Sequence, residues 1–471
     1  MESEEEGYAP SWIIERLQKA EESRAKLAGD ASNVSNSRIR RTPEYLAERA
    51  EFRRYYFPQL IAIGPVHLDR RINHLQGEPF KEAWTTMYLT DTNQSVNDLY
   101  NTIFRESELL KEIRQLHGED MWQRMSYYYS GYGTDTYEFI RWLLVVDGCS
   151  ILHLLEKSGD SVDPQRDLNI SVDKLVRMYQ DLLIMDNQIP FKVLRLFCKD
   201  EARLEKCLRN FLQVHGIKTA PELGKGKKNT QEAAQELKLV VQGDDEDPVH
   251  LLDYLRRALL MRDLDTIHKE IPAAEMKNKR RSLHLTKYRI GSIRELKAAG
   301  ISLRRHSDGN SIYPSFEAGI LHLPELVVDG TTPHIFLNLV AYEMSHSDND
   351  FEISSYLVFL SSLVDQPEDV KELRMAGILI NELASDKEVS DLFNKMDIIL
   401  VPETPWFANI RDQIHSHFES KRGRIRMLSW MGEASNTFFR SPWTIIALLA
   451  ATLGLVLTFI QTWFAIHPKA S

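Results

Sequence analysis

The sequence predicts a mainly α fold: a large multi-helix body with a small antiparallel β element and one C-terminal transmembrane helix. Three observations support this class. Apolar residues recur at helical spacing through most of the chain, which is typical of helices that bury one face. Between residues 301 and 328 the apolar runs become short and are broken by Gly, Pro and Asp-Gly, as in strands joined by turns. The third observation is a long uncharged segment close to the C-terminus.

This uncharged segment, from Trp443 to Ile466, predicts a helix that spans a membrane. Its 24 residues contain no Asp, Glu, Lys, Arg or His. At about 1.5 Å per residue such a helix is roughly 36 Å long, enough to cross a hydrocarbon core of about 30 Å. Trp443 and Trp463 lie near its ends, where indole rings favour the headgroup region. We therefore expect a lipid bilayer as one partner and a single-pass anchor at 443–466.

The charges beside this segment predict on which side of the membrane the body lies. Basic residues precede it at positions 421, 422, 424, 426 and 440, and Lys469 follows it. A basic excess marks the cytosolic flank, and the acidic start of the chain is not a secretory signal, so we expect a cytosolic body at the plasma membrane or an endomembrane. The alternative is a body outside the cytosol, with glycans on the sequons at Asn33, Asn93 and Asn169.

Composition and spacing argue against several other classes of protein. The net charge of −10 gives no support for nucleic-acid binding. Three cysteines without a CxxC pair favour neither a disulfide framework nor structural zinc, and the histidines lack HxxxH spacing. The glycines at 224 and 226 lack the spacing of a phosphate-binding loop. We therefore expect no cofactor, no metal and no nucleic-acid partner.

The chain divides into segments of different character. Residues 1–41 are polar and small toward their end, so we expect a mobile N-terminal segment. Residues 42–440 are expected to form the body. Within it, residues 216–249 predict a flexible insertion because a basic cluster, an acidic cluster, Gly and Pro follow one another there.

Helices are expected through most of the body. The stretch Tyr137–Leu155 is the most apolar outside the C-terminal segment, but it carries charged residues and therefore predicts a core helix. Pro190 is expected to divide the apolar run 172–196 into two helices that meet at 187–190. A buried stripe is expected at Leu99, Ile103, Leu109, Leu110 and Ile113. Further helices are expected at 292–300, 334–345, 351–365, 367–380 and 386–397.

Short motifs along the body resemble one plant family. They are Ile63-Gly64-Pro65-Val66-His67; Lys81 after Glu78 and Phe80; Val146-Asp147-Gly148-Cys149; Asp181-Leu182-Leu183 with Asp186-Asn187-Gln188-Ile189-Pro190; Leu296-Lys297-Ala298-Ala299-Gly300-Ile301; and Leu337-Asn338-Leu339-Val340-Ala341-Tyr342-Glu343. Together they are similar to the plant family of domain of unknown function 247, over residues 42–466. The sequence departs from the family at Asp186, which replaces a Glu, and before Lys81, where an expected His is absent.

The resemblance implies a mostly helical body, a C-terminal hydrophobic span and a plant source, but no reaction. Some members from grasses are associated with pollen self-incompatibility, in which a partner recognises a variable surface. The family motifs single out a set of candidate functional residues. They are Gly64, Pro65, His67, Lys81, Asp147, Gly148, Cys149, Asp186, Asn187, Gln188, Pro190, Asn338 and Glu343.

Two functions remain open from the sequence. The first is recognition or signalling at a membrane through an unknown protein partner, related to the self-incompatibility role of some family members. The alternative is a membrane-tethered hydrolase or transferase that uses Cys149 with His153, or Asp147 with Asp181. Packed surroundings for these four residues would favour recognition, whereas a shared cleft would favour an enzyme.

Overall fold

The computed structural model describes residues 41–67, 75–117, 122–123, 125–127, 136–159, 163–217, 247–260, 290–306, 312–345, 351–396, 404–420 and 442–466. The predicted mobile segment 1–41 and flexible insertion 216–249 lie mostly outside these residues. All of the candidate functional residues named from the family motifs lie within the described residues.

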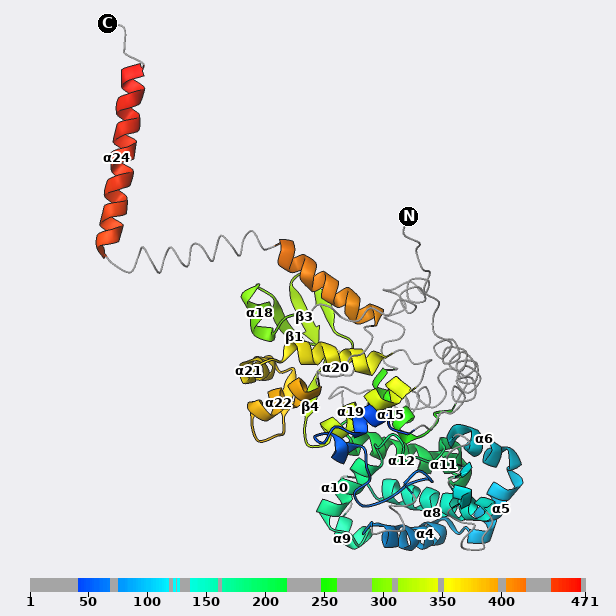
Figure 1. The fold of residues 1–471 in the computed structure, drawn as a ribbon. Coiled ribbons are helices and arrows are strands. Elements are labelled where there is room, and N and C mark those ends of the chain that lie inside the picture. Colours follow the sequence, from blue (N-terminus) through cyan, green and yellow to red (C-terminus); the bar gives the residue numbers. More distant parts are fainter. Residues whose placement is uncertain are drawn as a thin grey trace, which may run out of the picture.

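Helices dominate the first half of the body, which is drawn from blue to green in Figure 1. They are α2 (Glu44–Ala47), the 3-10 helix η1 (Arg53–Tyr55), α4 (Glu78–Thr92), α5 (Val96–Arg105), α6 (Ser107–His117), α8 (Thr136–Glu156), α9 (Pro164–Asp167), α10 (Val172–Asp181), α11 (Phe191–Phe197) and α12 (Glu201–Val214). The predicted stripe from Leu99 to Ile113 is buried at all five positions, which confirms the helical spacing read there.

The core helix of this half is α8, on which α4, α5, α11 and α12 pack. Its residues from Leu143 to Leu155 are all buried, as the sequence predicts for Tyr137–Leu155. Gly148 lets α11 approach closely, because a Cβ at this position would stand 2.8 Å from a ring carbon of Phe197. The predicted division at Pro190 is confirmed as well: α10 ends at Asp181 and α11 begins at Phe191.

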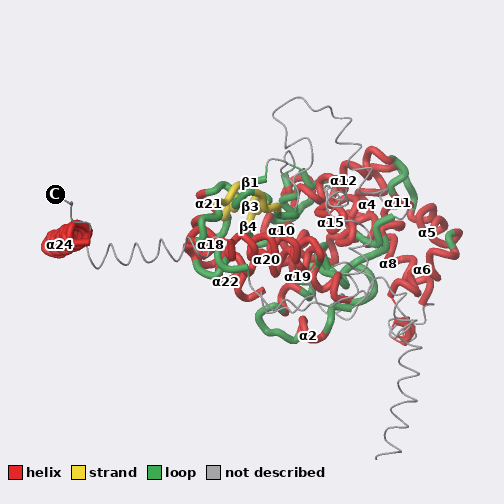
Figure 2. The backbone as a smooth tube through the Cα atoms, turned by 90° about the horizontal axis from the view of Figure 1, so that it is seen from above, coloured by secondary structure: helices red, strands yellow, loops and turns green. Residues whose placement is uncertain are grey.

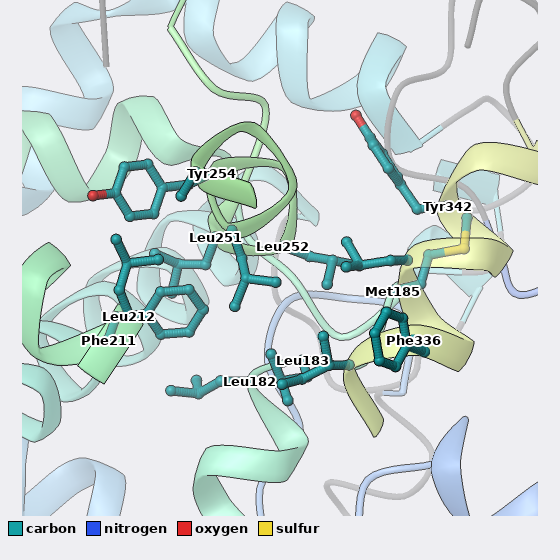
Figure 3. Packing of buried hydrophobic residues seen from close by; sticks show 14 of the residues in the cluster. Leu182, Leu183, Met185, Phe211, Leu212, Leu251, Leu252, Tyr254, Phe336 and Tyr342 are labelled. Carbon is teal, nitrogen blue, oxygen red and sulfur yellow. The ribbon is translucent and has the colours of Figure 1, made fainter. Parts of the chain in front are cut away.

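The second half contains α15 (Leu251–Leu260), α18 (Ile293–Ala298), α19 (Thr332–Ser345), α20 (Glu352–Leu363), α21 (Pro367–Met375), α22 (Asp386–Met396) and a helical stretch at 405–420. One apolar cluster runs through both halves. Figure 3 shows the place where the turn after α10 meets α12, α15 and α19. Its labelled side chains are Leu182, Leu183, Met185, Phe211, Leu212, Leu251, Leu252, Tyr254, Phe336 and Tyr342.

Two small sheets lie at the opposite end of the body from α5 and α6 (Figures 1 and 2). The first contains β1 (Ser302–Arg305), β2 (Ser315–Glu317) and β3 (Ile320–Leu323) in the order β1-β3-β2. Between β2 and β3, Ala318 and Gly319 both have positive φ, as a tight hairpin turn requires, so the antiparallel prediction is right for this pair. It is wrong for the rest: β1 runs parallel to β3, and β4 (Leu326–Val328) runs parallel to β5 (Leu379–Asn381).

The strand β5 also corrects a predicted helix. The sequence predicts a helix over 367–380, but α21 ends at Met375 and the chain turns at Gly377, where φ is +68°. Glycine adopts this left-handed conformation without a steric penalty and commonly ends helices. The apolar residues that follow then pair with β4 and bury Leu379.

The predicted transmembrane helix is the part of the fold class that the structure contradicts. The helix α24 (Pro442–Ile466) does include both predicted ends, Trp443 and Ile466. Over the described residues, however, no helix has both the length and the apolarity that a membrane crossing needs.

Candidate functional site

Residues 59–64 form a segment that runs through the body without joining a sheet. Side chains take the place of a neighbouring strand. The Asp181 carboxylate, at the end of α10, accepts hydrogen bonds from three consecutive amides: Gln59 at 2.8 Å, Leu60 at 2.7 Å and Ile61 at 2.9 Å. Leu60 and Ile61 are buried, so their amides depend on this carboxylate rather than on water.

The next three amides of the segment are held by three further side chains. Glu78 accepts from Ala62 at 2.7 Å, Asn187 from Ile63 at 2.7 Å, and Asp147 from Gly64 at 2.9 Å. Six successive amides are thus satisfied by side chains from α4, α8, α10 and the turn before α11. This arrangement fixes the conformation of the segment and connects four parts of the body through it.

Lys81 forms ion pairs with two of these carboxylates. Its Nζ lies 2.8 Å from Oε2 of Glu78 and 2.7 Å from Oδ1 of Asp147, and it donates to the Ala62 carbonyl oxygen at 2.5 Å. Lys81 is 1% exposed and Asp147 is 0% exposed. Two charges that are removed from water in this way each depend on the other.

The turn between α10 and α11 supplies the rest of the network. Gln188 donates to the carbonyl oxygens of Leu182 and Ile184, at 2.7 and 3.0 Å, and so closes the turn on itself. Asp186 accepts from the Thr42 amide at 3.0 Å and hydrogen-bonds His67 Nε2 at 2.7 Å. These contacts form a hydrogen-bonded corner before Pro190, where the sequence predicts that two helices meet.

Asn338 connects α19 to the same corner, whereas Glu343 lies between α15 and the start of α20. Asn338 accepts from the Met185 amide at 3.0 Å and donates to the Tyr55 carbonyl oxygen at 2.9 Å. Glu343 accepts from Nε of Arg256 at 2.9 Å and from the Ser354 amide at 2.8 Å in the first turn of α20. It therefore takes the role of an N-cap for α20, whose own N-cap residue provides no side-chain acceptor.

The replacement Gly64→Ala is expected to lower the free energy of unfolding by about 3 kcal/mol. Gly64 has φ of +67°, and a Cβ here would stand 2.2 Å from the Gln188 carbonyl oxygen. Urea denaturation of the full-length chain measures the change. Gly330→Ala is the control, because a Cβ there meets nothing within 4 Å. Equal stability of the two variants would contradict a tight fit of this segment against the corner.

Cys149 and His153, the first enzymatic alternative, lie inside the packed core helix. Cys149 is 0% exposed and burial raises the pKa of its thiol to about 12, so the thiolate that a nucleophile needs is disfavoured. His153 is buried, and desolvation lowers the pKa of its imidazole. Among the described residues, neither ring nitrogen of His153 has a hydrogen-bond partner. The cysteine therefore packs as a small apolar residue.

Asp147 and Asp181, the second enzymatic alternative, both bind the 59–64 segment. Burial raises the pKa of Asp181 to about 7, although the three amide donors act in the opposite direction. The oxygens of Asp147 and Asp181 are occupied by Lys81 and by backbone amides. Within the described residues, no three His, Cys, Asp or Glu side chains gather as a metal site would require. The arrangement is suited to holding backbone in place.

A second feature, on the surface, was missed by sequence reasoning. We define the aromatic patch as Tyr100 and Phe104 of α5 with Tyr137, Arg141 and Trp142 of α8. Phe104 is 59% exposed, Trp142 41% and Tyr137 36%. The guanidinium of Arg141 lies 4.8 Å from the Phe104 ring centre and 5.8 Å from that of Tyr100. The sequence does place two aromatic residues of α5, Tyr100 and Phe104, four positions apart. This spacing predicts a buried core position equally well as an exposed one.

Fold and site together define a class of protein: a mainly helical body whose motif residues are mostly buried and hold its backbone together. The chain belongs to the DUF247 family, described as a plant protein of unknown function, which it matches over residues 39–457. The resemblance predicted from the motifs is therefore confirmed.

Two relatives from Arabidopsis thaliana show the extent of this similarity. UPF0481 protein At3g47200 is 25% identical over 433 residues, which cover 87% of this chain and 83% of the relative. Putative UPF0481 protein At3g02645 is 27% identical over 174 residues, or 36% of this chain and 32% of the relative. No solved structure matches the chain.

Proposed function

We propose that the protein acts in protein–protein recognition and that the aromatic patch is its contact surface. The observation that carries this proposal is the environment of Arg141. Its guanidinium lies over two aromatic rings, and its buried Nε has no hydrogen-bond partner among the residues that the structure describes. Within the described part of the chain, the structure gives this arginine no carboxylate partner. A guanidinium that is held over two rings and has no carboxylate partner is placed to bind a carboxylate of another protein.

The composition of the patch agrees with a contact surface. Tyrosine, tryptophan and arginine are the residues that most often dominate the binding energy of interfaces. Their rings present large rigid areas, and arginine binds carboxylates with two parallel hydrogen bonds. The partner we propose is therefore a protein segment that presents a carboxylate beside apolar side chains. Such a segment would pair with Arg141 while covering Phe104 and Trp142.

The position of the patch supports the same proposal. It lies on α5 and the start of α8, at the end of the body far from the two sheets (Figures 1 and 2). The family-motif residues are mostly buried, and Asp147 and Asn187 among them hold backbone amides of the 59–64 segment. In this arrangement the motif residues keep the body rigid, and the exposed residues of the aromatic patch can be replaced without a change in that buried network. A rigid body is useful to a recognition protein because less conformational freedom is lost on binding.

The replacement Arg141→Glu tests this function. We expect it to weaken the partner complex by at least about 10-fold, since it removes a guanidinium and adds a like charge opposite the carboxylate. Partners are first collected by proximity labelling of the full-length protein in plant tissue. The affinity of a purified partner is then measured for the wild type and for the variant.

The control is Arg177→Glu, which makes the same charge change on an exposed position of α10. Both variants must melt at the wild-type temperature. The proposal is supported if a purified partner loses affinity for Arg141→Glu and keeps it for Arg177→Glu. It is overturned if the wild type and Arg141→Glu label the same proteins to the same extent.

A further inference from the structure

A pocket of about 130 Å³ lies where the end of α12, α15, α19 and α20 meet the chain around β4. Its wall is mostly apolar and includes Ala258, Ile335, Phe336 and Ile353. No residue of the aromatic patch or of the 59–64 segment lines it. The volume is close to that of an engineered apolar cavity of about 150 Å³ that admits benzene, so the space suits one small ring.

Tyr356 of α20 brings a hydroxyl group to this wall. The side chain lines the pocket and is 2% exposed, and its ring packs against those of Phe336 and Phe407, with centroids 6.1 and 6.3 Å away. Among the described residues its hydroxyl has no hydrogen-bond partner. The unpartnered hydroxyl of Tyr254 is sealed from water, whereas that of Tyr356 keeps surface that a water molecule can reach. Because the residue is otherwise buried and lines the pocket, this surface opens into the pocket.

The other polar side chains of the wall are closed off or already engaged in part. Both ring nitrogens of His215 are buried out of reach of water. The Thr332 hydroxyl donates to Oδ1 of Asp329 at 2.9 Å, and the same oxygen accepts from two backbone amides at 2.8 Å. Glu325 forms an ion pair with Arg305. The wall therefore offers a ligand apolar surface, two carboxylates and the open tyrosine hydroxyl.

We propose that this pocket binds a small, mostly apolar molecule with one carbonyl oxygen that accepts a hydrogen bond from the Tyr356 hydroxyl. The size limits the ligand to about one six-membered ring with a short substituent. The hydroxyl keeps its proton and acts as the donor, because burial raises the pKa of Tyr356 above its ordinary value. The carboxylates of Glu325 and Asp329 disfavour an anion. The proposal is independent of the aromatic patch and of its partner.

Cyclohexanone and toluene are the probes, because each is a six-membered ring with a small substituent and only the ketone carries a carbonyl oxygen. Tyr356→Phe keeps the aromatic ring and removes the hydroxyl. We expect this replacement to weaken binding of cyclohexanone to the full-length chain about 5-fold, which corresponds to one hydrogen bond of about 1 kcal/mol. The affinity for toluene should not fall, since toluene makes no such bond. Titration calorimetry measures both affinities.

Tyr254→Phe is the matched control, since the Tyr254 hydroxyl is also buried and unpartnered among the described residues but does not line the pocket. It should change neither affinity. A second variant, Ala258→Leu, should weaken both probes by filling the pocket, and it keeps the proposal testable if Tyr356→Phe fails to fold.

Three results would overturn the proposal. The first is that neither probe binds the wild type up to its solubility limit. The second is that Tyr356→Phe leaves the affinity for cyclohexanone unchanged, or lowers it no more than Tyr254→Phe does. The third is that Ala258→Leu binds both probes as tightly as the wild type, because the probes would then bind outside the pocket.

Discussion

Lys81→Met is expected to lower the free energy of unfolding by about 3–5 kcal/mol, which is a large part of the stability of a typical domain. The replacement removes the ammonium group that pairs with Asp147, a carboxylate that is 0% exposed and so is poorly solvated by water. It also takes away the donor to the Ala62 carbonyl oxygen. Methionine nearly preserves the volume of the side chain, so a cavity contributes little. Urea denaturation of the full-length chain, followed by circular dichroism, measures the loss.

Lys111→Met is the control for this experiment. Lys111 forms a similar ion pair with Glu108, but the two side chains are 68% and 75% exposed, so we expect a change within about 0.5 kcal/mol. The double variant Lys81→Met with Asp147→Asn should recover part of the loss, because the unpaired charge is then gone. If Lys81→Met is as mild as Lys111→Met, the carboxylates of the network do not depend on Lys81.

The sequence predicted the parts of this fold that depend on local spacing. The stripe from Leu99 to Ile113 and the core helix at 137–155 follow from apolar residues that recur every three or four positions, and each helix satisfies its own backbone. Pro190 predicted a break because the ring removes an amide donor at one known residue. These inferences need only neighbours in the chain, and the structure confirms them.

The strand pairings could not be predicted in the same way. β4 pairs with β5, more than 50 residues further on, and the apolar residues after Gly377 read equally well as the end of a helix. A parallel pair carries no turn that would reveal it in the sequence, unlike the Ala318-Gly319 hairpin between β2 and β3. The transmembrane prediction rested on the length of 443–466, its lack of charge and its terminal tryptophans, and over the described residues no helix has the length and apolarity that a crossing needs.

The candidate site shows a similar division. Family motifs identified Asp147, Asn187 and Lys81 as important, but not that all three act on the same segment. The Asp147 carboxylate reaches an amide 83 residues away, and that of Asp181 reaches amides 120 to 122 residues away. Separations of this size leave no periodic pattern in the sequence. The role of these carboxylates as acceptors for backbone amides therefore became visible only in three dimensions.

Asp181→Ala is expected to cost about 3–5 kcal/mol, because it removes the acceptor of three neighbouring amides at once. The amides of Leu60 and Ile61 are buried and bind the same oxygen, Oδ2. Without this oxygen the two amides would remain buried and would have no hydrogen bond to offset their loss of water. Since Asn187 and Glu78 hold only the following amides, they cannot replace the lost acceptor. Urea denaturation measures the stability, and amide hydrogen exchange reports on the segment itself.

Asp391→Ala makes the same truncation on an exposed position of α22, so its effect should stay within about 0.5 kcal/mol. Hydrogen exchange gives the sharper comparison. In Asp181→Ala the amides of residues 59–61 should exchange at least 10-fold faster than in the wild type, while those in the middle of α22 change only as far as global stability falls. Unchanged exchange at 59–61 would mean that other groups protect these amides. The 59–64 segment would then owe its conformation to apolar packing of Leu60 and Ile61 and not to the carboxylate.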